Sequence, residues 1–125
     1  RAGLDYWNLL EVHVHKDYES MERFLAGHHF YYNTTKAPRA YTDAAFHEDD
    51  VLVFGKETKG LPESLLLRHE EDCIRIPMIG EARSLNLSNA VAIVALEALR
   101  QTGFPGLAES STRLFKEGAD VGEYL

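Results

Sequence analysis

The stretch from Ile74 to Arg100 constrains the fold of this chain more than any other. It begins with the short apolar alternation IRIPM, which Pro77 interrupts. A polar loop over residues 80–86 follows, and the run from Ala90 to Leu99 is then apolar on almost every side of a helix. This order predicts a strand, a loop and a helix that needs burial on more than one side.

An earlier stretch, VLVFGKETKGLP over residues 51–62, has a similar order of parts. Val51 to Phe54 is a continuous apolar run, as expected for a strand covered on both faces. Gly55 and Gly60 then bracket a polar loop. Loops that follow the strands of an open parallel sheet lie where such sheets bind ligands. We therefore expect the two loops to form the walls of one site.

The remaining segments alternate strands with helices. We expect strands at residues 9–14 and 28–34, a helix between Asp17 and Gly27, and a short helix from Pro62 to His69. Residues 36–50 are rich in turns, with Tyr41 and Phe46 as apolar anchors. No Asn-Gly hairpin signal separates the strands. The fold class predicted is therefore α/β with a mainly parallel sheet.

Charge and cysteine content exclude some classes of function. The chain has 125 residues and a formal net charge of −7, which argues against a generic nucleic-acid binder but leaves room for a local basic patch. Cys73 is the single cysteine and is expected to be a small buried apolar side chain. His13 and His15 have no third ligand at a suitable spacing, so no metal is expected. No apolar run has the length of a membrane span, and we expect a cytoplasmic protein.

The loop between Gly55 and Gly60 differs from a phosphate loop where the chemistry matters. A phosphate loop needs Lys and then Ser or Thr after the second glycine, and here Leu61 and Pro62 follow. Gly55 permits close approach of a ligand to the backbone. Glu57 then places a carboxylate at the edge of the site, unless this is only a tight turn with a solvated glutamate.

The second loop carries hydroxyl and amide side chains: Ser84, Asn86, Ser88 and Asn89. Ser88 alone would be explained as a helix cap. The whole set exceeds what one cap requires, so these groups are expected to hydrogen-bond a polar ligand. Ile76 and Met78 would pack against its flat face.

Taken in order, FGKETKGLP, IRIPM and ARSLNLSNA resemble the second and third motifs of the SpoU branch of the SPOUT RNA 2′-O-methyltransferases. The start, RAGLDY, and residues 33–36 resemble the small single-domain members that methylate the wobble ribose, position 34, of tRNA. The similarity covers residues 1–106, and we expect residues 107–125 to form a tail with one weak helical segment near residues 112–116.

The resemblance implies a deep C-terminal trefoil knot, S-adenosyl-L-methionine as cofactor, a homodimer and a tRNA substrate. The positions that match cofactor contacts are Asn33, Gly55, Ile76, Met78, Ser84 and Leu85. The positions that match polar catalytic residues are Glu57, Ser84 and Asn86. Asn33 departs from the family, in which an apolar residue such as leucine is usual at this position. Lys56, Lys59, Arg68 and Arg83 are candidates for phosphate contacts.

One part of the family pattern has no match in the sequence. The first motif, Asn-x-Gly followed by a catalytic arginine, is absent, and Arg1 is not in a matching context. Because that arginine is thought to help deprotonate the attacking hydroxyl, we expect the 125-residue chain to have little methyltransferase activity. The alternative is a catalytically inactive module of the same fold that binds cofactor or RNA, or dimerises.

Overall fold

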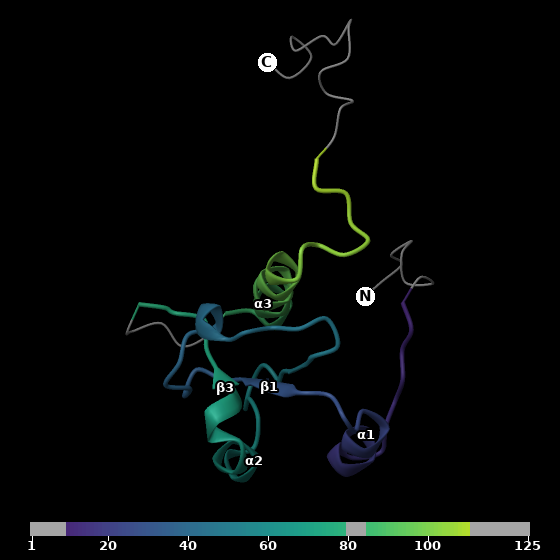
Figure 1. Ribbon diagram of the computed structural model, residues 1–125. Helices are drawn as coiled ribbons and strands as arrows, with labels where there is room; N and C mark the ends of the chain where they lie inside the picture. The colour runs from purple at the N-terminus through teal and green to yellow at the C-terminus, as the bar shows by residue number, and fades with distance from the viewer. Residues whose placement is uncertain (1–9, 80–84, 111–125) are drawn as a thin grey trace, which may run out of the picture.

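A three-stranded parallel sheet forms the centre of the computed structural model, which describes residues 10–79 and 85–110 (Figure 1). The strands are β1 (Phe30–Asn33), β2 (Val51–Val53) and β3 (Cys73–Ile74), in the order β2-β1-β3 across the sheet. Tyr31 lies opposite Leu52 in β2, and Asn33 lies opposite Ile74 in β3. The expected α/β class with a parallel sheet is confirmed.

Side chains alternate along β1 and create an apolar cluster on each face of the sheet. Tyr31 packs in a cluster with Val94 of α3 (Leu87–Gln101), whereas Tyr32 packs in a second cluster with Leu65 of α2 (Glu63–Arg68). Figure 1 shows α3 on one side of the sheet and α1 (Tyr18–Phe24) and α2 on the other. The aromatic residues of the central strand are therefore core residues.

The helix boundaries follow local signals in the sequence. Asp17 caps α1, because its side chain accepts a hydrogen bond of 2.9 Å from the Ser20 backbone N–H. Gly103 follows the last turn of α3 with φ of +86°, a backbone conformation that favours glycine. Pro62 lies one residue before α2 rather than at its first position. Two short 3₁₀ helices, Tyr41–Asp43 and Glu70–Asp72, precede the later strands.

The predicted strand at residues 9–14 is wrong over its described part. Residues 11–15 form no helix and pair with no described strand, and the Val14 side chain is 93% exposed. His13 and His15 instead pack against the Phe24 ring of α1, at centroid distances of 4.8 and 5.0 Å. A period of two in apolar residues predicts a strand only when a sheet edge is available for pairing.

Two further strands are shorter or less buried than expected. β3 contains only Cys73 and Ile74, with Arg75 in an isolated bridge to Ala40. Beyond Ile74, the Arg75 N–H donates to the Arg39 carbonyl, and Pro77 has no N–H with which to continue a ladder. β2 is half-buried along its length, because it lies at the edge of the described sheet.

The long helix α3 is buried on one side only within the described chain. Val94 is fully buried, whereas Leu96 is 57% exposed and Val91 is 38% exposed. The expected burial on a second side is thus not supplied by residues 10–79 and 85–110. Across these same residues, no helix combines the length and apolarity needed to cross a membrane.

Candidate functional site

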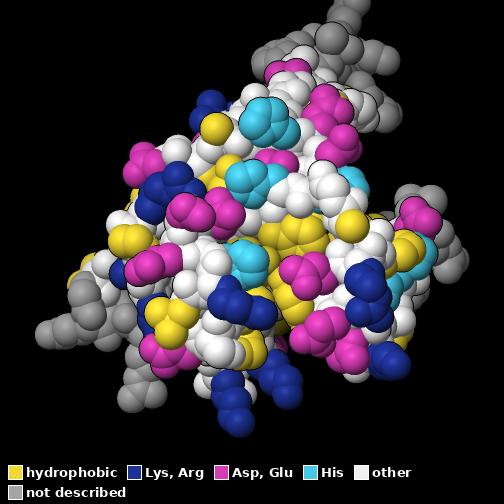
Figure 2. Space-filling view, turned by 60° about the horizontal axis from the view of Figure 1, so that its bottom comes forward, with side chains coloured by type: hydrophobic (Ala, Val, Ile, Leu, Met, Phe, Trp, Pro, Cys, Tyr) yellow, Lys and Arg dark blue, Asp and Glu magenta, His cyan; other side chains and the backbone are white. Residues whose placement is uncertain are grey.

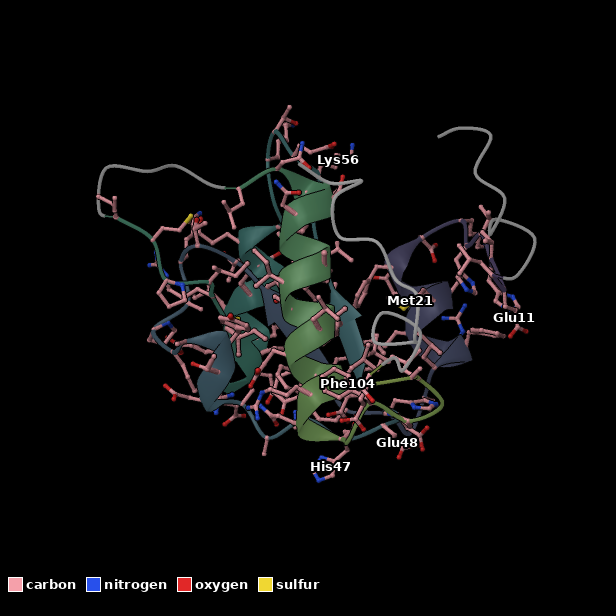
Figure 3. All side chains as sticks on the ribbon, turned by 90° about the horizontal axis from the view of Figure 1, so that it is seen from above. Glu11, Met21, His47, Glu48, Lys56 and Phe104 are labelled. Atoms are coloured by element: carbon pink, nitrogen blue, oxygen red, sulfur yellow. The ribbon has the colours of Figure 1, made fainter. Side chains whose placement is uncertain are left out.

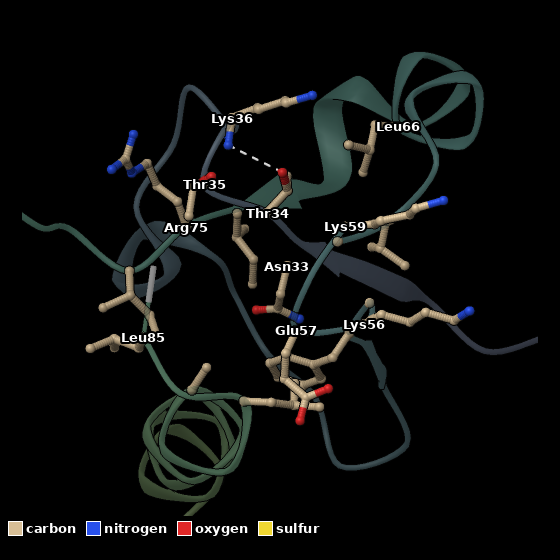
Figure 4. A pocket seen from close by; sticks show the side chains of 18 of the residues that line it. Asn33, Thr34, Thr35, Lys36, Lys56, Glu57, Lys59, Leu66, Arg75 and Leu85 are labelled. Carbon is tan, nitrogen blue, oxygen red and sulfur yellow. Dashed lines mark hydrogen bonds between the residues drawn. The ribbon is translucent and has the colours of Figure 1, made fainter. Parts of the chain in front are cut away.

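A cavity of about 260 Å³ lies at the carboxyl ends of the strands (Figure 4). It brings together the loop after β1, the loop at residues 55–60, the chain after β3 and the first turn of α3. The expected cofactor residues with a described position all line it: Asn33, Gly55, Ile76, Met78 and Leu85. Ser84 lies outside the described residues. The loop at residues 55–60 and the described end of the second loop, Leu85, line the same cavity, and the rest of the second loop stays a prediction.

The loop from Gly55 to Gly60 is closed by its own backbone. The Gly60 N–H donates to the Lys56 carbonyl at 2.8 Å, and Gly60 has φ of +70°. A Cβ atom at Gly55 would overlap the Gly60 carbonyl group and the Leu61 nitrogen. Glycine is thus required at position 55 for loop closure itself. A Gly55→Val change would break the loop first and would not report on how closely a ligand approaches.

Asn33 is the last residue of the central strand, β1. Its Nδ2 donates a hydrogen bond of 3.0 Å to the Val53 carbonyl at the end of β2. Its Oδ1 is buried and has no hydrogen-bond partner among the described residues. Both the residue and its neighbours in the following turn line the cavity, where the Lys36 backbone N–H donates to Thr34 Oγ1 at 3.1 Å (Figure 4).

Asn86, rather than Ser88, is the residue that caps the start of α3. The Asn86 side-chain oxygen caps α3 by accepting hydrogen bonds from the Ser88 and Asn89 backbone N–H groups, at 2.8 and 3.4 Å. Asn86 is not among the residues that line the cavity, although its neighbours Leu85 and Leu87 are. A catalytic role for Asn86 stays a prediction, and its oxygen is already used by the helix.

Glu57 is the carboxylate of the cavity lining. Its side chain is exposed, and Figure 4 shows it among the lining side chains. No described residue forms an ion pair with it. A carboxylate in this position is available to organise the loop or a polar ligand.

Basic residues gather at the same edge of the sheet. Lys56 and Lys59 line the cavity as expected, and so do Lys36 and Arg75, which sequence analysis missed. Arg75 directly follows β3 and Lys36 comes three residues after β1, so their place after a strand is the signal that would have found them. Of the other candidates, Arg68 does not line the cavity and Arg83 lies outside the described residues.

The amino-terminal edge of the sheet has the opposite character. The segments before β2 and β3 are acidic, Glu48–Asp50 and Glu70–Asp72, and His28 and His29 precede β1. In Figure 3, Lys56 lies near one end of α3 and His47 and Glu48 lie near the other. Figure 2 shows two basic side chains projecting at the lower margin of its face, with other basic and acidic side chains spread over the rest of that face. The cavity edge is therefore richer in basic side chains and the amino-terminal edge richer in carboxylates, although Glu57 lines the cavity and Arg39 contacts Glu71.

Cys73 is not part of this site. Its Sγ is buried and donates to the Leu66 and His69 carbonyls at 3.7 and 3.4 Å. Burial raises the pKa of the Cys73 thiol, with nearby Asp72 adding to the effect. The thiol is protonated and inert at neutral pH, as the sequence suggested. In the described ranges, no three His, Cys, Asp or Glu side chains are grouped to hold a metal ion.

Comparison with known proteins identifies relatives of this chain. The tRNA (cytidine(34)-2′-O)-methyltransferase of Escherichia coli strain K12 is 44% identical over 107 residues, which cover 85% of this chain and 68% of that protein. The chain spans about two thirds of the length of the curated relatives it matches.

Solved structures agree with this similarity. One, reported for the 2-OH methylation of C/U34 on tRNA, has a TM-score of 0.74 and 37% identity over 78% of this chain and 64% of that chain. An AdoMet-bound rRNA methyltransferase from Sinorhizobium meliloti has a TM-score of 0.58 and 32% identity, over 66% of this chain and 33% of that one.

The family match covers most of the described fold and both loops of the cavity. The SpoU rRNA Methylase family matches residues 1–96, which include all three strands and most of α3. On this match and on the identity to its relatives, the chain belongs to the SpoU rRNA Methylase family.

Proposed function

We propose that the protein carrying this chain is an S-adenosyl-L-methionine-dependent methyltransferase that acts on the ribose 2′-hydroxyl at position 34 of tRNA. The observation that carries the proposal is the cavity at the carboxyl ends of the strands, which both family motifs line. Relatives at 44% identity are named for this reaction.

The cavity suits a cofactor with a flat ring and polar edges. Ile76, Met78 and Leu87 supply apolar lining, and the buried Asn33 Oδ1 is an acceptor without a partner among the described residues. Ligand sites combine apolar walls with a few placed polar groups in this way. When bound, S-adenosylmethionine supplies an activated methyl group. We assign its binding to Asn33, Gly55, Ile76, Met78, Ser84 and Leu85.

The task left to the side chains is to orient the ribose and assist loss of its proton. Holding two reactants in a reactive geometry can supply about 7–11 kcal/mol of the barrier. We place Ser84 and Asn86 as orienting groups and Glu57 as the carboxylate that organises the loop at residues 55–60. Proton removal from the hydroxyl requires a general base, which typically contributes about 10²–10⁴-fold.

The charge distribution favours RNA at the cavity edge. Lys36, Lys56, Lys59 and Arg75 line the cavity together with a single described carboxylate, Glu57, whereas two acidic segments lie at the opposite edge. Phosphate contacts from Lys and Arg supply most sequence-independent affinity for nucleic acids. An acidic protein with a net charge of −7 therefore still offers one basic edge to tRNA. We propose that it acts in the cytoplasm.

We also propose the C-terminal trefoil knot and a homodimer formed through the outer face of α3. The similarity to these two solved structures, together with the family match, supports the knot. The exposed apolar side chains of α3, Val91 and Leu96, support the dimer. Leu96→Glu should shift the protein towards monomer in analytical ultracentrifugation, whereas Arg100→Glu, at an exposed polar position on the same helix, should not. A dimer that persists in Leu96→Glu would place the interface elsewhere.

The decisive test is transfer of the tritiated methyl group from S-adenosylmethionine to tRNA that lacks modification at position 34. Nuclease digestion and mass spectrometry should locate the methyl group on the ribose of nucleotide 34. Replacing Lys56 and Lys59 together by glutamine should weaken tRNA binding and reduce its salt dependence. Methylation of a base, or of a ribose elsewhere, would overturn the proposed reaction. Cofactor binding without transfer would favour the catalytically inactive module.

A further inference from the structure

The Asn33 side chain carries a buried oxygen that has no hydrogen-bond partner among the described residues. Asn33 is the last residue of β1, and its Nδ2 donates to the Val53 carbonyl at 3.0 Å. Its Oδ1 is buried without a hydrogen-bond partner, and no other buried side-chain nitrogen or oxygen in the described ranges shares this condition. Native structures rarely leave a buried polar atom unpaired, because its desolvation is not compensated.

The neighbouring carbonyl fixes the orientation of this amide. Exchanging the oxygen and nitrogen of Asn33 would place Oδ1 against the Val53 carbonyl, so that two acceptors would face each other. The hydrogen bond therefore directs Nδ2 towards β2 and leaves Oδ1 on the other side of the amide plane. Figure 4 shows Asn33 in the middle of the side chains that line the cavity.

We infer that Asn33 Oδ1 accepts a hydrogen bond from an N–H or O–H group of the ligand bound in this cavity, and so contributes to selecting it. The inference rests on the proposed S-adenosylmethionine site. That ligand carries three kinds of donor: the amine of the adenine ring, the ribose hydroxyls and the α-ammonium group. Where the resembling family has leucine, only the backbone is available for polar contact, so the side-chain contact is an addition of this chain.

A purely structural role for Asn33 predicts the opposite experimental pattern. If the side chain only ties β1 to β2 through Val53, then Asn33→Leu should destabilise the ligand-free protein and leave ligand affinity unchanged. If Oδ1 serves the ligand, the same variant should weaken binding. Ligand-free stability should change little, because the variant removes an uncompensated buried oxygen together with one hydrogen bond.

The first experiment measures S-adenosylhomocysteine binding by calorimetry and ligand-free stability by urea unfolding. Asn33→Leu should bind about 3- to 10-fold more weakly, as expected for one lost hydrogen bond. Asn33→Asp keeps an oxygen acceptor but removes the donor to Val53, so its affinity should lie closer to that of the unmodified protein while its stability falls. Equal affinity in Asn33→Leu and the unmodified protein would overturn the inference.

The second experiment identifies the donor with analogues of S-adenosylhomocysteine. One analogue replaces the adenine by hypoxanthine, two lack a single ribose hydroxyl, and one lacks the α-amino group. For the analogue without the matching donor, the affinity ratio between the unmodified protein and Asn33→Leu should fall to about one. A ratio that persists with every analogue would overturn a direct hydrogen bond. Failure of the unmodified protein to bind S-adenosylhomocysteine at all would instead overturn the proposed cofactor site, and this inference with it.

Discussion

Gln101, near the end of α3, should contribute more to stability than its surface position suggests. Its Oε1 accepts a hydrogen bond of 2.8 Å from the Phe46 backbone N–H, and its Nε2 donates one of 2.9 Å to the Ala44 carbonyl. The Ala44 and Phe46 side chains are buried in the cluster between α3 and the sheet. One side chain thus fixes the α3 terminus to a loop more than 50 residues away.

The size of the effect follows from the groups that would lose their partners. Gln101→Met keeps the length and helix propensity of the side chain but leaves the Phe46 N–H and the Ala44 carbonyl unpaired. A buried group without its partner costs about 1–3 kcal/mol, and since these bonds are only part-buried we expect about 2 kcal/mol for the two together.

The assay is urea unfolding followed by circular dichroism, with Arg100→Met as the matched control. Arg100 pairs with Glu97 at 2.9 Å on the same turn, but its side chain is 63% exposed. Breaking such a pair costs about 0.5 kcal/mol or less. If Gln101→Met lost no more stability than Arg100→Met, the two backbone hydrogen bonds would not be contributing as argued.

Three further changes test local features of the fold. Removing the α1 cap in Asp17→Ala should cost about 1 kcal/mol, and hydrogen exchange at the Ser20 amide should become faster. Hydrogen bonds from Arg100 and Gln101 lower the pKa of Glu97 from 4.5 to about 2, so its contribution to stability is complete above pH 4.5 and is lost as the pH falls towards 2. Unfolding free energy should therefore depend less on pH between 5 and 2 in Glu97→Gln; equal slopes would contradict this. Because burial raises the pKa of the Cys73 thiol, a thiol reagent at pH 8 should react only at the rate of unfolding, and rapid reaction with the folded protein would refute its burial.

The features that could be predicted from the sequence are those with local causes. Asp17 marks the start of α1 through its own side-chain chemistry, and the structure places it as predicted. The motif residues Gly55 and Ile76 were expected in one site, and they line the same cavity because both follow strands of a parallel sheet.

The features that could not be predicted depend on partners distant in the sequence. The alternation at residues 10–14 has no strand beside it in the described chain, so the pattern did not become a sheet. Asn86 and Ser88 are both residue types that favour the N-cap position. Asn86 is the cap because the first helical residue of α3 is Leu87, which the sequence pattern did not specify. The hydrogen bonds of Gln101 to Ala44 and Phe46 join segments that no sequence pattern links.

The basic side chains beside the cavity and the acidic segments before β2 and β3 contribute a dipole component along the strands in the described part of the chain. Lysines and Arg75 lie at the carboxyl edge of the sheet, and the carboxylates of Glu48–Asp50 and Glu70–Asp72 lie at the amino edge. In the field of a polyanion, such a dipole turns the protein before contact, and the acidic edge disfavours encounters in the wrong orientation. The field extends only about 8–10 Å at physiological salt. Association with a polyanion should therefore slow steeply as ionic strength rises. The encounters that remain productive should still present the basic edge of the sheet to the polyanion.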